Sequence, residues 1–193
     1  MVKDTDFLTK NQKTIEKKEA SMQTGEIISE YNSQILADIL NIDKESFEKQ
    51  YDDVEEYYKE ALENKDNINV ILRDGEKVVG YLLAIPHNDA VEDLKSADPE
   101  FKEDKERLYV ETIAVHPEYR IGGGAFKMIF TMIEEAGKRG INKFSMHVRV
   151  KGGLSAAVQK CFGKMITKVN RIENWPYYEN GEPTDYVEGT YEP

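Results

Sequence analysis

Apolar residues recur with a helical period in the first third of the chain. They are spaced three and four residues apart between positions 28 and 61, which predicts two helices that each bury one face. The first stripe consists of Ile28, Tyr31, Ile35 and Ile39, and the second of Phe47, Tyr51, Val54, Tyr58 and Ala61. Asp43 is the predicted N-cap of the second helix. Charged residues opposite the second stripe indicate a face in solvent.

The pattern changes to that of strands after residue 67. Two apolar runs, 69–73 and 77–85, flank Asp74-Gly75, a dipeptide that favours a hairpin turn. Pro86 ends the second run, and an acidic insertion at 87–106 follows, with a short helix expected near 90–96. A connection of this length is either a lid beside a substrate site or a surface decoration, and decoration is the more frequent case.

A glycine cluster separates a strand from a helix in the second half of the chain. Residues 108–115 are rich in β-branched and aromatic side chains, which predicts a strand that ends at His116-Pro117. The helix after the glycines is predicted to end at Gly140, and its apolar positions are Phe126, Ile129, Phe130 and Ile133. The remaining predicted elements are a strand at 143–150, a short helix at 155–165 with Ser155 as its cap, and a terminal hairpin at 167–191 that turns at Asn180-Gly181.

This order of elements predicts one domain, residues 1–193, of mixed α/β (α+β) class, with one mixed sheet covered by helices. A chain of 193 residues is long enough for one hydrophobic core and short for two. Residues 1–24 are polar and lack a clear period. We therefore expect a flexible end, or an edge strand near 19–22.

Composition narrows the range of partners. The net charge of −11 argues against binding to nucleic acid or to anionic membranes, because both need a basic surface. The charge suits a cationic substrate, although solubility alone is the more common reason for it. The sequence starts without a secretory pattern and its longest apolar run, 78–85, is too short to cross a bilayer, so a cytoplasmic location is expected. With Cys161 as its single cysteine, the chain has no intrachain disulfide, and no metal site is predicted.

The glycine cluster predicts an anion-binding site. Glycines let the backbone approach a ligand closely, and the free N–H groups at the start of a helix point outward with the helix dipole behind them. Such a site can hold a pyrophosphate even in an acidic protein, because its donors are backbone amides. Two common phosphate motifs do not fit. A P-loop requires Gly-Lys-Ser/Thr where this chain has Gly124-Ala125-Phe126, and a dinucleotide fingerprint begins directly after its strand.

Residues 108–130 resemble the GNAT superfamily of N-acetyltransferases. The family loop Arg/Gln-x-x-Gly-x-Gly/Ala is matched by Arg120, Gly123 and Ala125. The approach to it, I-A-V-x-P-x-Y-R, is matched in register by Ile113, Ala114, Val115, Pro117, Tyr119 and Arg120. The resemblance extends over about 67–187. Ile121 departs from the small or basic residue usual there, and Gly122 and Gly124 replace other residues, which predicts a more flexible loop.

The resemblance implies a mostly antiparallel sheet with helices on both faces and acetyl-coenzyme A as co-substrate. A primary amine would attack the thioester directly. The backbone near Ile113 and Val115 would bind the thioester carbonyl and the pantetheine arm. The complete set of implied cofactor contacts is Ile113, Ala114, Val115, Arg120, Ile121, Gly122, Gly123, Gly124 and Ala125.

Glu111 is the candidate general base, because several family members carry a catalytic or water-ordering glutamate at this place. It interrupts an otherwise apolar and hydroxyl-bearing strand, and partial burial would raise its pKa toward the working range. A solvent-facing or ion-paired glutamate is the alternative interpretation. Family members often place a tyrosine acid in the helix at 155–165, where Cys161 or Phe162 stands here and no hydroxyl is present. We expect Cys161 to act as a small apolar packing residue.

The tail carries the candidate acceptor residues. Tyr177-Tyr178 and the following Asn180-Gly181 resemble a hairpin in the branch that acetylates protein N-termini and ribosomal proteins, where the tyrosines line the peptide site. Aromatic pairing across a hairpin explains them equally well. Tyr51 is a further candidate, since its helix would border the acceptor groove. His116 is expected in a loop and His147 packed or in solvent.

Two functions remain in view. The first is N-acetyl transfer to a primary amine, with a peptide or protein amine favoured and a small amine next. The second is a non-catalytic module that binds coenzyme A, which the missing tyrosine and the unusual loop glycines support. The sequence leaves the oligomeric state and the identity of the acceptor open.

Overall fold

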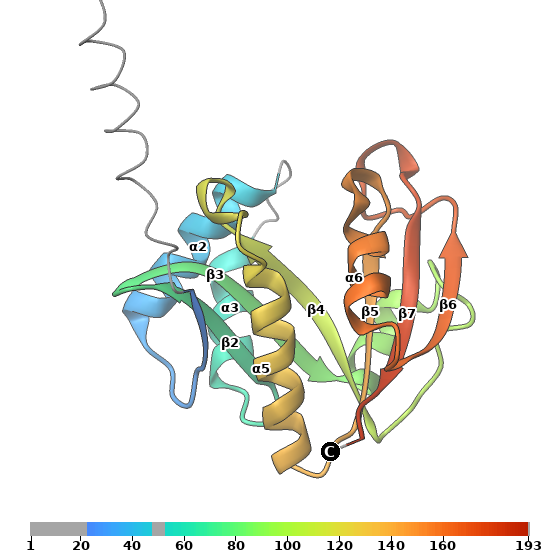
Figure 1. Cartoon of the computed structure of the whole chain (residues 1–193), viewed down its shortest axis with the longest axis horizontal. Coiled ribbons are helices and arrows are strands. Elements are labelled where there is room, and N and C mark those ends of the chain that lie inside the picture. Colours follow the sequence, from blue (N-terminus) through green and yellow to red (C-terminus); the bar gives the residue numbers. More distant parts are fainter. Residues whose placement is uncertain (1–22, 48–52, 193) are drawn as a thin grey trace, which may run out of the picture.

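A computed structural model describes residues 23–47 and 53–192, which form one seven-stranded sheet (Figure 1). The strands are β1 (Thr24–Ile27), β2 (Ile68–Asp74), β3 (Lys77–Pro86), β4 (Arg107–Val115), β5 (Lys143–Arg149), β6 (Ile166–Ile172) and β7 (Thr184–Thr190). They lie in the order β1-β2-β3-β4-β5-β7-β6, and every neighbouring pair is antiparallel except β4 and β5. The prediction of a mixed, mostly antiparallel sheet is therefore confirmed.

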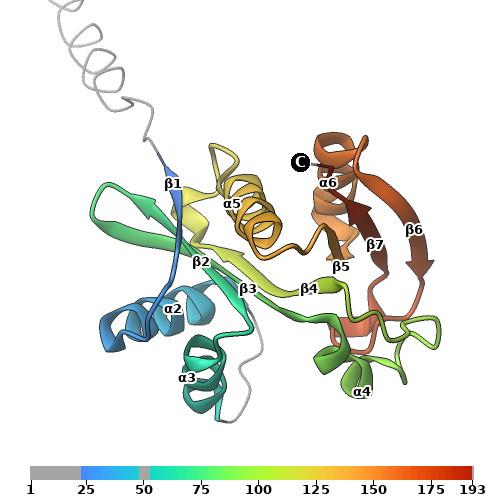
Figure 2. The same ribbon diagram turned by 90° about the horizontal axis from the view of Figure 1, so that it is seen from below.

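Helices cover both faces of this sheet, as predicted. They are α2 (Ser33–Ser46), α3 (Val54–Glu63), α4 (Val91–Leu94), α5 (Gly124–Lys138) and α6 (Leu154–Phe162), with 3-10 turns η1 (His87–Ala90), η2 (Pro117–Tyr119), η3 (Lys151–Gly153) and η4 (Glu179–Gly181). In Figure 2, α5 and α6 lie on one face, and α2, α3 and α4 on the other. In the part of the chain that the structure describes, no helix is long and apolar enough to cross a membrane.

Each face of the sheet has its own hydrophobic core. Met128 and Met132 of α5 are fully buried against Leu82 and its neighbours on one face. Ile39 of α2 packs with Tyr81 of β3 on the other face. The sheet is therefore covered on both sides over β2 to β4, and functional groups can reach solvent mainly at strand ends and where strands separate.

The two N-terminal helices begin later than the periodicity predicts. Asn32 caps α2, because its side chain accepts from the N–H groups of Gln34 and Ile35 at 2.8 and 3.2 Å. The prediction that Asp43 caps the second helix is wrong. Asp43 is a buried residue of α2 whose carboxylate accepts hydrogen bonds from the hydroxyls of Tyr58 and Tyr81. Residues of such a buried polar network recur along a helix at the same spacing as the residues of an apolar stripe. The period of the sequence therefore cannot distinguish the two.

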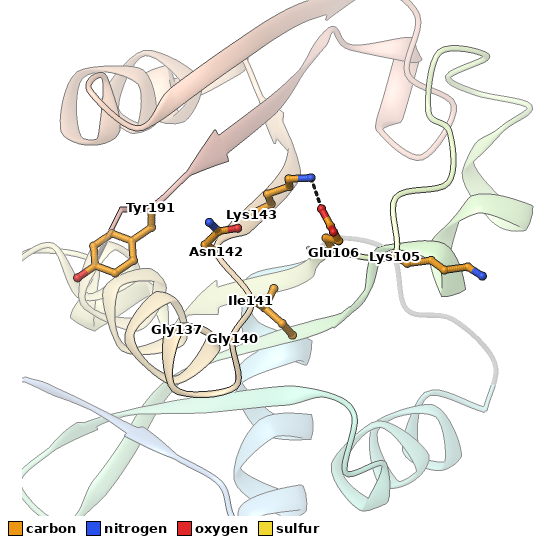
Figure 3. A pocket seen from close by; sticks show the side chains of 8 residues that line it. All are labelled: Lys105, Glu106, Gly137, Gly140, Ile141, Asn142, Lys143 and Tyr191. Carbon is orange, nitrogen blue, oxygen red and sulfur yellow. Dashed lines mark hydrogen bonds and ion pairs between the residues drawn. The ribbon is translucent and has the colours of Figure 1, made fainter.

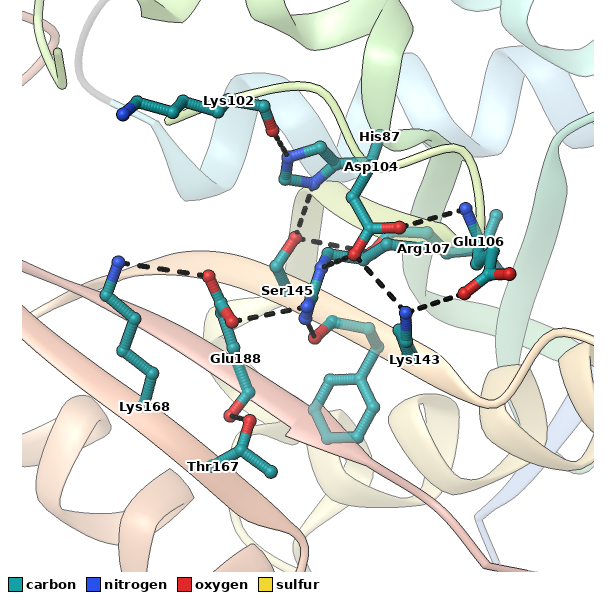
Figure 4. Close-up of polar contacts among 12 residues, drawn as sticks. His87, Lys102, Asp104, Glu106, Arg107, Lys143, Ser145, Thr167, Lys168 and Glu188 are labelled. Atoms are coloured by element: carbon teal, nitrogen blue, oxygen red, sulfur yellow. Dashed lines mark hydrogen bonds and ion pairs between the residues drawn. The ribbon is translucent and has the colours of Figure 1, made fainter. Parts of the chain in front are cut away.

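The acidic insertion is pinned to the sheet by polar contacts (Figure 4). His87, where the insertion begins, lies 2.9 Å from Ser145 Oγ of β5. Arg107, where it ends, forms ion pairs with Asp104 of the insertion and Glu188 of β7, both at 3.2 Å. The short helix expected at 90–96 is present as η1 followed by α4. The insertion is thus a packed wall beside β4.

The C-terminal predictions need three corrections. Ser155 does not cap α6. Gly153 precedes that helix with a φ of 79°, and the buried Ser155 hydroxyl donates to Asp185. Cys161 is exposed, so it has no packing role. Strands β6 and β7 do pair, but a long connection joins them, and Asn180-Gly181 lies inside it with positive φ angles of 57° and 62°. The edge strand expected at 19–22 falls outside the described residues.

Candidate functional site

Strands β4 and β5 separate in the middle of the sheet (Figure 1). Their parallel pairing joins Arg107–Val110 to residues 143–146, four pairs in all. Beyond these pairs, β4 continues beside β3 and β5 beside β7. The β4 backbone between Glu111 and Val115 therefore faces no strand on its β5 side in the described sheet, and its polar groups on that side can bind a ligand.

Glu111 lies where this separation begins, in a β-bulge. On one side of it Val110 pairs with Ala84, and on the other Thr112 pairs with Leu83, so Glu111 has no partner in β3. A bulge adds one residue to a strand and redirects its side chains. As a result, Glu111 turns toward α3, where the Tyr57 hydroxyl donates to its Oε2 at 2.6 Å.

The surroundings of Glu111 favour its protonated form. Burial raises the pKa of the Glu111 carboxyl above its ordinary value, the Tyr57 hydrogen bond opposes this, and the negative charges of Asp93 and Asp89 add to the rise. Both aspartates belong to the acidic insertion, so that wall contributes to the electrostatics of the site. A carboxyl with a raised pKa is a stronger base than an ordinary carboxylate, and beside an opening in a sheet it is a candidate for proton transfer.

A second buried polar group lies on the same face. The Tyr109 hydroxyl is 3.0 Å from His147 Nδ1, and His147 Nε2 is 3.3 Å from Asp98 Oδ2. Since the carboxylate only accepts, Nε2 carries the proton, and a neutral imidazole then accepts the Tyr109 proton at Nδ1. Burial lowers the pKa of His147, in keeping with the neutral form. Trp175 stacks on the imidazole with ring centroids 4.3 Å apart.

Sequence reasoning missed this group. His147 was expected to be packed or in solvent, and it is packed, but its bond to Tyr109 was not predicted. Tyr109 precedes Glu111 by two residues in β4, so the period of a strand was a sign that both share a face. The third member, Asp98, comes from the irregular insertion, whose position relative to the sheet no local pattern predicts.

The glycine loop has the geometry of a cradle for an anion. Gly122 and Gly123 have φ angles of 117° and 73°, and α5 begins directly afterwards at Gly124. The first N–H groups of that helix have no partner within it. Arg120 Nε donates to the Val115 carbonyl at 3.1 Å, which ties the loop to the end of β4. A pyrophosphate therefore fits this site through backbone donors.

The predicted cofactor residues fall into two groups along one path. Ala114 and Val115 are buried and Ile113 is half-buried, so a ligand would meet their backbone. The loop residues are mostly exposed, and Ile121 is 76% exposed. The first group lies on the edge of β4 that β5 leaves open, and the second lies in the loop that follows this edge in the chain.

Two of the predicted acceptor residues, Tyr177 and Tyr178, lie in the connection between β6 and β7. The Tyr177 hydroxyl donates to the backbone carbonyl of Asp93 at 2.8 Å, so the β6–β7 connection touches the acidic insertion. Tyr178 is half-buried, with the Arg149 guanidinium 5.1 Å from its ring centroid. Tyr51 lies outside the described residues.

A cavity of about 610 Å³ lies away from these residues (Figure 3). It opens at the start of β4 and β5, beside Lys105, Lys143 and Tyr191. None of the predicted site residues lines it. In the described part of the chain, no cluster of three or more His, Cys, Asp or Glu is arranged to hold a metal ion.

Comparison with known proteins identifies the family to which this chain belongs. The sequence profile described as "Acetyltransferase (GNAT) family" matches residues 36–163, about two thirds of the chain. A search of curated proteins found no match.

Solved structures of the same fold are similar to this chain over most of their length. The ribosomal-protein-S18-alanine N-acetyltransferase from Escherichia coli is 15% identical, with a TM-score of 0.63 over 88% of this chain and 93% of that one. NAA60 from Arabidopsis thaliana in complex with acetyl-CoA is 18% identical, with a TM-score of 0.63 over 88% and 98%. An aminoglycoside 6'-acetyltransferase type Ii is 15% identical, with a TM-score of 0.63 over 89% and 98%. The chain belongs to the acetyltransferase (GNAT) family.

Proposed function

We propose that this acetyltransferase of the GNAT family transfers an acetyl group from acetyl-coenzyme A to a primary amine by direct attack, with Glu111 as general base. The observation that carries the proposal is the position of Glu111. It occupies a bulge where β4 and β5 separate, its pKa is raised, and the chain's glycine loop lies at the far end of the same open edge.

Two stretches of backbone would hold the cofactor. The N–H groups of residues 120–125 and the start of α5 would bind the pyrophosphate, with Arg120 keeping the loop against β4. The unpaired edge at residues 113–115 would bind the pantetheine arm and the thioester carbonyl. Acetyl-coenzyme A supplies the activated acetyl group, and no covalent bond to the enzyme is needed.

Proton transfer would be divided between two groups. The attacking amine must lose a proton, which the Glu111 carboxylate accepts, and the raised pKa of this carboxyl increases its basicity. The departing thiolate gains a proton, which the hydroxyl of Tyr109, a buried residue of β4, would donate. The Tyr109 phenolate would then recover a proton from solvent, while the protonated Glu111 releases one to solvent. His147 Nδ1 accepts from the Tyr109 hydroxyl and so positions it, and Asp98 holds the Nε2–H.

The acceptor would approach from the side of Tyr57, Tyr177 and the acidic insertion. Carboxylates at Asp89 and Asp93, with aromatic rings around them, favour a positively charged acceptor. A peptide or protein amine is our first choice, in view of Tyr177 and Tyr178, and a small amine such as a polyamine or amino sugar is the second. Both classes occur among the similar structures, which include an enzyme for ribosomal protein S18 and one for aminoglycosides.

A continuous assay of thiol release with a panel of peptide and small amines tests the proposal. We expect turnover with at least one cationic amine. The alternative, a non-catalytic module, predicts that coenzyme A raises the melting temperature while no amine in the panel is acetylated.

A further inference from the structure

Gln23, the first described residue, lies beneath the glycine loop. Its side chain is only 4% exposed, although it precedes the edge strand β1. Strand β1 packs closely on α5, since a Cβ added at Gly25 would come within 2.3 Å of Thr131 Oγ1. This contact places the segment before β1 against the start of the helix that the loop precedes.

Gln23 is bonded to both sides of the loop. Its Nε2 donates to the carbonyl of Tyr119 at 3.1 Å, just before the loop. Its own backbone carbonyl accepts from Lys127 Nζ of α5 at 2.9 Å, just after the loop. One residue thus connects two points 96 and 104 positions along the chain, and the loop lies between them.

The Gln23 carboxamide also fills the space that loop side chains would occupy. A Cβ at Gly122 would lie 3.3 Å from Gln23 Oε1, and one at Gly124 would lie 3.0 Å from it and 2.3 Å from Leu72 Cδ2. At Gly122 the φ angle of 117° favours glycine, and at Gly124 a side chain would collide with Leu72 and approach the Gln23 amide, so both positions suit glycine. The support under the loop comes from the N-terminal strand instead of from the loop itself.

The Gln23 Oε1 atom is buried and finds no hydrogen-bond partner among the described residues. A buried acceptor without a partner is destabilising, so a side chain selected for stability alone would be apolar. The amide is therefore poorly explained by packing, and the hydrogen bond that its Nε2 donates is directed at the carbonyl just before the loop.

We propose that Gln23 is a positioning residue for the cofactor. It holds residues 120–124 in the conformation whose N–H groups converge on the pyrophosphate. This inference rests on the acetyl-coenzyme A site proposed above, and it deepens that proposal by assigning a role to the N-terminal end of the described chain. Gln23 acts through the loop and touches neither the thioester nor the acceptor.

The test compares Gln23→Met with the wild-type protein, because methionine keeps the length and removes the amide. We expect the Kd for coenzyme A, measured by calorimetry, to rise about tenfold, roughly 1.4 kcal/mol of binding free energy. The KM for acetyl-coenzyme A should rise with it, while kcat and the KM for the amine stay unchanged. The melting temperature without cofactor should stay the same or increase.

Two further variants complete the test. Gln23→Glu places a negative charge near the pyrophosphate, so its Kd should rise further and depend more steeply on salt. Gln34→Met is the matched control, since Gln34 is exposed on α2, which lies on the opposite face of the sheet from α5. If Gln23→Met binds coenzyme A as tightly as the wild type does, Gln23 has no positioning role. If the wild type itself binds no coenzyme A, the proposed function fails instead.

Discussion

Glu111 has to meet two opposing demands. As the proposed base it must lose its proton, yet burial and the neighbouring aspartates favour keeping it. Because its pKa is higher in the folded protein than in the unfolded chain, its contribution to stability is largest at low pH and is lost as pH rises through the folded pKa. The position is therefore one where activity and stability conflict.

We predict that Glu111→Gln lowers kcat about a hundredfold, the scale of a lost general base, and makes the fold more stable at alkaline pH. The stability gain should shrink toward acidic pH, where the wild-type carboxyl is already protonated. Urea unfolding at several pH values and the thiol-release assay measure the two effects. A variant with full turnover and an unchanged pH profile contradicts the assignment.

Tyr109 is the second residue whose chemistry can be isolated. Tyr109→Phe removes the hydroxyl that bonds His147 and leaves the ring in place. We expect kcat to fall by about tenfold or more with little change in KM, and stability to fall by roughly 1 kcal/mol for the lost hydrogen bond. Tyr186→Phe is the control, because Tyr186 is buried in the same aromatic cluster. Equal losses of kcat in both variants would reduce Tyr109 to a structural role.

At the scale of elements, the acidic insertion depends on a buried histidine. Burial lowers the pKa of His87 below its ordinary value of 6.5. With His87 neutral, Nε2–H donates to the Lys102 carbonyl at 2.9 Å, and Nδ1 accepts from Ser145. The unfolded chain binds this proton more readily, so the stability that His87 contributes is present above the unfolded pKa and is lost as pH falls.

We therefore expect the unfolding free energy to decrease as pH falls from about 7.5 to 5.5, across the ordinary range of histidine titration. His87→Gln should flatten this dependence, whereas His116→Gln, at a half-buried position directly after β4, should leave it unchanged. Chemical unfolding at each pH provides the measurement. If the unfolding free energy depended on pH equally steeply in the wild type and in His87→Gln, the role assigned to His87 would be contradicted.

The elements themselves were largely predictable. Strands β2 to β5 and helix α5 follow from apolar runs, glycines and prolines, because those residues restrict the backbone locally. The caps of α3 and α6 were not predicted correctly, since Asp43 and Ser155 bond to distant hydroxyl and carboxyl groups. Partners that lie far along the chain leave no trace in a local pattern.

At the scale of the whole molecule, the sequence presents the proposed cofactor side as one local motif, whereas the proposed acceptor side comes together only in the fold. The loop and the end of β4 are one continuous stretch with a family pattern, so a single motif describes them. The acceptor side brings together α3, the acidic insertion and the β6–β7 connection, and Tyr57 and Asp98 come to it through tertiary packing alone. Neither residue is distinguishable from an ordinary surface residue in the sequence.

The separation of β4 and β5 has a consequence for the way the protein resists unfolding. The two parts of the sheet, β1 to β4 and β5 to β7, are joined across the middle by four residue pairs and by the insertion. A cofactor bound along the open edge would connect the two parts of the sheet. We expect coenzyme A to slow amide hydrogen exchange in β5 and β7 as well as in the loop, because opening one part would then require the ligand to leave. Protection confined to residues 120–128 would mean that the two parts open independently of the ligand.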